Sequence, residues 1–127
     1  MINNFLIINF IGQDDKLGLR INKDFFIHII KKENNMSKSL VSEILEFLKK
    51  HKVKLNQNFC VIVNQGPGSF SGVRIALAVA KGLEISTKVK VFGFRNSDLK
   101  QFDQENIEKL LNEKLIEKKL IKPIYLS

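Results

Sequence analysis

The strongest constraint on the fold lies in the middle of the chain, where an apolar strand leads through a glycine-rich turn into an apolar helix. Residues 59–63 are apolar without interruption, which is typical of a strand buried on both faces of a sheet. The helix predicted over residues 70–86 has only three charged side chains, those of Arg74, Lys81 and Glu84. A helix that is apolar almost all round needs cover on more than one side. The chain therefore folds into layers around this unit, or a partner covers part of the helix.

The rest of the chain alternates between strand and helix periodicities. Apolar patterning predicts strands in five segments: 5–10, 17–21, 25–30, 59–63 and 88–94. Helical spacing is found in three: 37–51, 70–86 and 104–120. We expect Ser37 to cap the first helix and Asp103 the third, followed by an extended tail over residues 122–127. Three hairpin-connected strands followed by alternating units predict an α/β domain with a mixed five-stranded sheet and helices on its faces.

Composition limits the class of protein. A chain of 127 residues has room for one domain, and 44% hydrophobic with 27% charged residues is ordinary for a folded protein. No apolar run approaches the roughly 18 residues of a membrane span, so we expect no membrane association. The lone cysteine, Cys60, excludes a disulfide framework and fits a reducing compartment, which predicts a cytoplasmic protein.

The net charge of +8, from 21 basic and 13 acidic residues, leaves two interpretations open. A basic excess can mark a nucleic-acid-binding protein. The excess is spread along the chain, however, and it equally fits a solvated lysine surface.

The glycine-rich turn is the most unusual local feature. Its residues of interest are Gly66, Pro67, Gly68, Ser69 and Gly72. A glycine-rich turn before a helix can cradle a phosphate, with Ser69 or Ser71 capping the helix. The simpler interpretation is a sharp strand-to-helix connection, and the pattern lacks the lysine of a nucleotide-binding P-loop.

Catalytic or metal-binding sets are not evident. His28 and His51 have no metal-ligand spacing, and Cys60 lies within an apolar strand. The pair Asp14-Asp15 is expected in a solvated turn. We therefore predict no catalytic residue, no metal and no cofactor.

The run from residue 61 to residue 83, which reads VIVNQGPGSFSGVRIALAVAKGL, resembles the signature of the bacterial TsaB (YeaZ) family. The ending, from Pro123 to Leu126, is similar to the closing Pro-x-Tyr-Leu of that family. The resemblance implies an actin-like ATPase, ribonuclease H-like fold. It also implies a role in making N6-threonylcarbamoyladenosine in tRNA, as a non-catalytic partner of the sister subunit TsaD rather than as an enzyme.

The resemblance further implies where partners bind. In that family TsaB pairs with TsaD through its first two long helices, which correspond here to residues 36–50 and 70–85. The expected interface residues are Leu40, Ile44, Phe47, Phe70, Val73, Arg74, Leu77 and Ala80. The ATPase TsaE is a possible further partner, tRNA is contacted indirectly through the complex, and the isolated chain is expected to form a homodimer.

Several positions depart from the family pattern. Asn9-Phe10 stands where the family has an acidic residue after its first strand, and Met36 stands where it has a histidine. The chain is also short, so we expect residues 1–127 to form one lobe, with residues 96–127 in place of the second. Two alternatives remain: a phosphate- or nucleotide-binding enzyme domain that uses the turn at residues 66–72, and a basic tRNA-binding module.

Overall fold

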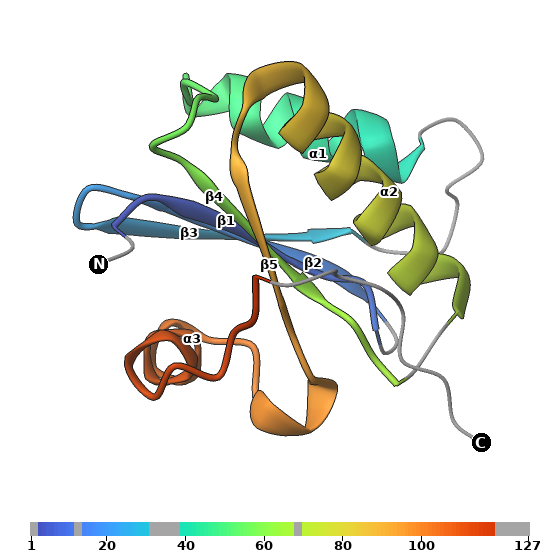
Figure 1. Cartoon of the computed structure of the whole chain (residues 1–127), viewed down its shortest axis with the longest axis vertical. Coiled ribbons are helices and arrows are strands. Elements are labelled where there is room, and N and C mark those ends of the chain that lie inside the picture. The colour runs from blue at the N-terminus through green and yellow to red at the C-terminus, as the bar shows by residue number, and fades with distance from the viewer. Residues whose placement is uncertain (1–2, 12–13, 31–38, 68–69, 119–127) are drawn as a thin grey trace.

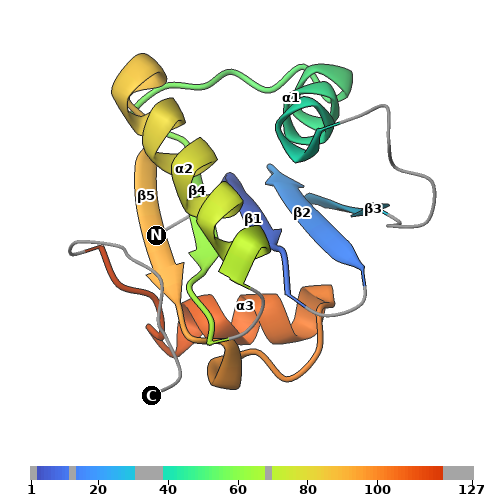
Figure 2. The same cartoon turned by 90° about the vertical axis from the view of Figure 1, so that its right-hand side faces the viewer.

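The computed structural model describes residues 3–11, 14–30, 39–67 and 70–118. These residues form a sheet with helices on both faces (Figures 1 and 2). The strands are β1 (Phe5–Asn9), β2 (Asp15–Ile21), β3 (Asp24–Ile30), β4 (Cys60–Asn64) and β5 (Lys90–Phe94). The helices are α1 (Leu40–Lys50), α2 (Phe70–Thr87), the short 3-10 helix η2 (Asn96–Asp98) and α3 (Gln104–Asn112).

The sheet is mixed, with the strand order β3-β2-β1-β4-β5. Strands β1, β2 and β3 are antiparallel neighbours, whereas β1, β4 and β5 run parallel. Helices α1 and α2 lie on one face of the sheet and α3 lies on the other (Figures 1 and 2). The predicted α/β class, with a mixed five-stranded sheet and helices on its faces, is confirmed.

Each face of the sheet has its own hydrophobic cluster. Successive side chains of a strand point to opposite faces, so Leu6 and Ile8 of β1 pack under α1 and α2, whereas Phe5 and Ile7 pack toward α3. All four side chains are fully buried. Coverage of both faces explains why the β1 and β4 segments are apolar without alternation.

The helix caps agree only in part with expectation. Asp103 caps α3 as predicted, because its Oδ1 accepts a hydrogen bond from the backbone N–H of Asn106 at 2.9 Å. The N-cap of α1 is Ser39, whose Oγ accepts from the N–H of Ser42 at 3.1 Å. Ser37 lies outside the described residues, and the prediction that it caps the helix is wrong.

The third helix is shorter than its sequence pattern suggested. It ends at Asn112, and Lys114 adopts a left-handed backbone with φ of 56°. The chain then returns to the sheet, where Glu117 and Gly93 exchange two backbone hydrogen bonds of 2.8 Å. Pairing with the edge of β5 therefore replaces the helical continuation expected to residue 120. The tail over residues 122–127 lies outside the described residues.

None of the helices within the described ranges is long and apolar enough to cross a membrane.

The first turn of α2 approaches the end of β1 very closely. Gly72 is buried, and a Cβ atom placed on it would lie 2.3 Å from the carbonyl oxygen of Phe10. Only glycine permits this approach, because real Cβ atoms do not come within 3.0 Å of other heavy atoms. Gly82, ten residues further along the same helix, is exposed, and a Cβ there would meet nothing within 4 Å.

The two glycines should respond oppositely to the same substitution. We expect Gly72→Ala to lower the free energy of unfolding by roughly 3 kcal/mol, because the backbone must shift to make room. We expect Gly82→Ala to raise it by about 0.5–1 kcal/mol, because alanine is the better helix former. Urea denaturation of both variants measures the difference, and equal effects would contradict the described packing.

Candidate functional site

Three asparagines meet at the carboxyl ends of the parallel strands. Asn9 ends β1, Asn64 ends β4, and Asn96 opens the 3-10 helix that follows β5. The Nδ2 atom of Asn64 donates to Oδ1 of Asn9 at 2.6 Å and to Oδ1 of Asn96 at 3.0 Å. We call these residues the asparagine triad. Ligands of open α/β sheets bind at this edge, so the triad marks the first place to look for chemistry.

The triad also fixes the start of the glycine-rich turn. Oδ1 of Asn64 accepts a hydrogen bond from the N–H of Gly66 at 2.9 Å. The carbonyl oxygen of Gly66 accepts from the N–H of Asn96, also at 2.9 Å. Gly66 has φ of 93°, a left-handed conformation that favours glycine. Both backbone polar groups of Gly66 are therefore engaged within the protein and not presented to a ligand.

The structure describes some of the other turn residues, and these differ in burial and in contacts. Pro67 is half-buried, whereas Gly68 and Ser69 lie outside the described residues. Gly72 serves the close contact with Phe10. Ser71 is exposed inside α2 and so does not cap it.

The triad itself offers only neutral amides, and Asp15, which opens β2 beside the end of β1, places a buried carboxylate at the same edge of the sheet. Amides donate and accept hydrogen bonds but do not exchange protons near neutral pH. In the described part of the chain, no group of three or more His, Cys, Asp or Glu side chains could hold a metal ion. Burial raises the pKa of the Cys60 thiol, and the positive charges of Lys90 and Lys118 act in the opposite direction. A thiol with a raised pKa remains protonated near neutral pH and is a poor nucleophile.

Sequence reasoning noted Asn9 but missed the other members of the triad. The available signal was a polar residue at or just beyond the end of each parallel strand, at positions 9, 64 and 96. The pair Asp14-Asp15 also differs from expectation. Asp15 opens β2 and is only 3% exposed, so its side chain is not solvated.

Most of the expected interface residues belong to the core of the chain itself. The buried members are Ile44, Phe47, Val73, Leu77 and Ala80. They pack between the two helices and the sheet. Leu40 is half-buried and Arg74 is exposed, while the side chain of Phe70 is not described.

Other side chains on the same two helices are exposed. The buried residues of α2 follow one helical stripe: Val73, Ala76, Leu77, Ala80 and Leu83. The opposite side of α2 is open, with Ala78, Gly82 and Ile85 exposed, and Ile85 is 76% exposed. On α1, Val41 is 42% and Leu45 is 47% exposed. We call these five residues the outer face.

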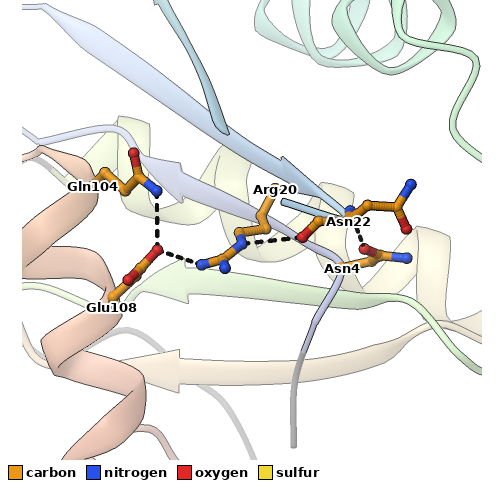
Figure 3. Close-up of polar contacts among 5 residues, drawn as sticks. All are labelled: Asn4, Arg20, Asn22, Gln104 and Glu108. Atoms are coloured by element: carbon orange, nitrogen blue, oxygen red, sulfur yellow. Dashed lines mark hydrogen bonds and ion pairs between the residues drawn. The ribbon is translucent and has the colours of Figure 1, made fainter. Parts of the chain in front are cut away.

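Helix α3 covers the opposite face of the sheet. Polar side chains connect this helix to β2. Arg20 forms an ion pair with Glu108, which also accepts a hydrogen bond from Gln104 at 3.0 Å (Figure 3). Both charged side chains are partly exposed, so the pair contributes at most about 1 kcal/mol to stability. The apolar contacts of Ile107 and Leu110, which are 0% and 1% exposed, provide the larger part.

The mixed five-stranded sheet with helices on both faces is consistent with the expected actin-like, ribonuclease H-like fold, and solved structures named YeaZ share it. YeaZ from Pseudomonas aeruginosa is similar, with a TM-score of 0.66 over 88% of this chain and 50% of that chain, at 19% identity. A second structure, described as an uncharacterized protein similar to the peptidase YeaZ from Pseudomonas aeruginosa, has a TM-score of 0.64 over 88% of this chain and 49% of that chain. At this identity the likeness establishes the fold alone.

Sequence comparison then gives the family. A family model described as TsaD, tRNA N6-adenosine threonylcarbamoyltransferase, matches residues 31–98, more than half of the chain, so the chain belongs to this family. Its curated relatives include two proteins named tRNA threonylcarbamoyladenosine biosynthesis protein TsaB, from two Buchnera aphidicola strains. The Baizongia pistaciae relative is 52% identical over 44% of this chain, and the Schizaphis graminum relative is 35% identical over 46%. The expected resemblance to TsaB is confirmed. The matches span only 26% and 30% of those relatives.

The asparagine triad should be essential for stability. Replacing Asn64 by Leu removes the donor to both neighbours and the acceptor of the Gly66 N–H, in a residue that is 1% exposed. We expect the free energy of unfolding to fall by roughly 2–4 kcal/mol, because buried polar groups lose their partners. The exposed Asn58→Leu is the control, with an expected change within about 0.5 kcal/mol. Equal urea midpoints for the two variants would contradict this role.

Proposed function

We propose that this chain acts in the formation of N6-threonylcarbamoyladenosine on tRNA, as a non-catalytic partner of a TsaD subunit. The observation that carries the proposal is the sequence match: the TsaD family model covers residues 31–98, and the relatives are named TsaB. These names support a role in this modification pathway. The partner role and its surface are argued from the geometry of α1 and α2.

The outer face is the surface best suited to a partner. It presents Val41, Leu45 and Ile85 on two helices that lie on the same side of the sheet (Figure 2). Burying an exposed Leu or Ile side chain against a partner contributes on the order of 1–2 kcal/mol. Ala78 and Gly82 are exposed on the same helix as Ile85, and their small size leaves room for a second helix to approach closely. In the absence of TsaD, the same face would pair with a second copy of this chain.

The hydrogen bonds of Asn64 and the protonation of Cys60 support a non-catalytic role. Asn64 is engaged on both sides of its amide, because its Nδ2 donates to Asn9 and Asn96 and its Oδ1 accepts from Gly66. Burial raises the pKa of the Cys60 thiol. The rival hypothesis, a phosphate- or nucleotide-binding enzyme, needs free N–H groups in the turn at residues 66–72. The N–H of Gly66 is bound to Asn64 instead, at 2.9 Å. We therefore assign catalysis in the complex to the TsaD subunit.

Binding to TsaD should depend on the outer face. We expect the double substitution Leu45→Glu with Ile85→Glu to abolish co-purification with TsaD from the same organism, because two carboxylates would be buried in an apolar contact. Both side chains are exposed, so the thermal midpoint of the isolated variant should stay close to that of the wild type. Substitutions at Ala76 or Ala80 would be unsuitable, because both residues are 0% exposed and belong to the core.

The matched control is Asn112→Glu, which places a carboxylate at an exposed position of α3. It should leave co-purification unchanged. Unchanged recovery of TsaD with the double variant would refute the outer face as the interface. A reconstituted modification assay with and without this chain tests the wider proposal, which predicts that N6-threonylcarbamoyladenosine is formed only when the chain is present.

A further inference from the structure

A second polar feature lies at the opposite edge of the sheet, where the strands begin. A cavity of about 200 Å³ is bounded by the start of β1, the β2–β3 turn and the loop between α1 and β4. Its polar lining residues are Asn4, Asn22, Lys52, Lys54, Asn56 and Asn58. Ile21, Val53 and Phe59 line the remainder. We call this cavity the amino-edge pocket.

The charge of the amino-edge pocket is entirely positive. Its described lining includes Lys52 and Lys54 and no acidic side chain. In the part of the chain that the structure describes, neither lysine takes part in an ion pair. The sequence agrees, because residues 49–54 contain four lysines and residues 47–83 contain no Asp or Glu. The pocket therefore favours an anion.

The asparagines of the pocket add hydrogen-bond donors to this charge. Oδ1 of Asn4 accepts from the backbone N–H of Asn22 at 2.7 Å (Figure 3). Oδ1 of Asn56 accepts from the N–H of Asn58 at 2.8 Å. With the two amide oxygens so engaged, the NH₂ groups of Asn4 and Asn56 donate to no other described residue. Two amide donors and two cations thus line one small cavity, and all four suit phosphate oxygens.

The size of the pocket limits the ligand. Pockets for whole cofactors or drug-sized molecules measure roughly 300–1,000 Å³, and this one measures about 200 Å³. It suits one phosphate group better than a complete nucleotide. A phosphodiester of a polymer fits this description, because neighbouring phosphates can meet the exposed lysines around the pocket.

We propose that the amino-edge pocket binds the phosphodiester backbone of RNA. The choice of RNA over other polyanions rests on the proposed function, since the relatives are named for tRNA modification. No residue of the pocket belongs to the outer face, so RNA binding and TsaD binding are separately testable.

The test is binding of an unmodified tRNA transcript to the isolated chain, measured by fluorescence anisotropy over a series of salt concentrations. Lys52→Gln with Lys54→Gln removes two cations, and we expect affinity to fall at least tenfold. The slope of log affinity against log salt should become shallower by roughly 1.5. Asn56→Asp keeps the acceptor for the N–H of Asn58 but adds a negative charge to the pocket, and it should weaken binding to a similar extent.

The control variants carry the same kinds of substitution at exposed positions on or beside α3. Lys100→Gln with Lys109→Gln removes two exposed cations, and Asn112→Asp adds one carboxylate. Both should leave affinity within about twofold, and thermal melting confirms that each variant is folded. Equal weakening by the control pair would overturn the proposal in favour of general attraction to a basic protein. Absence of tRNA binding by the wild type would overturn it even if TsaD still co-purifies.

A membrane surface is the competing source of phosphate groups. Vesicles of phosphatidylserine and phosphatidylcholine test it in the same salt series. Binding to vesicles that Asn56→Asp abolishes, together with an unchanged affinity for tRNA, would overturn the RNA proposal. Tight binding to tRNA that Asn56→Asp weakens, with no binding to vesicles, supports it.

Discussion

The close contact between the first turn of α2 and the end of β1 is the constraint on which the rest of the structure depends. Gly72 lies directly against the carbonyl of Phe10, where a single added carbon would collide with it. The contact brings α2 down on the sheet, so that one stripe of its side chains completes the core beneath. Asn64 and Gly66 hold the connecting turn from the other end. The opposite stripe of α2 remains uncovered and becomes the surface available to a partner.

Much of this architecture could be predicted from periodicity. The five strands, the three α-helices and the mixed sheet follow from apolar patterns whose period changes along the chain. The uninterrupted apolar run of β4 correctly indicated burial on both faces of the sheet. The end of α3 could not be predicted in this way, because the pattern beyond Asn112 still permits a helix. There the pairing of Glu117 with Gly93 outweighs local preference.

The proposed partner surface was harder to predict than the fold. A helix that is apolar all round does not reveal which side faces its own sheet, so the buried Val73, Leu77 and Ala80 were expected at the interface. The exposed Ile85 is distinguished only by its place on the opposite stripe. The hydrogen bonds of the asparagine triad join residues that are 55 and 32 positions apart in sequence. Such contacts depend on strand order, which a pattern of single residues does not encode.

Hydrogen–deuterium exchange of this chain, alone and mixed with a TsaD subunit, tests the central claim most directly. We expect the chain to close its own core and to present only the outer face to TsaD. Addition of TsaD should then slow amide exchange in peptides from Leu40–Lys50 and Phe70–Thr87, with no change in Gln104–Asn112. Slower exchange in α3 with none in α1 and α2, or no change in any peptide, would contradict this expectation.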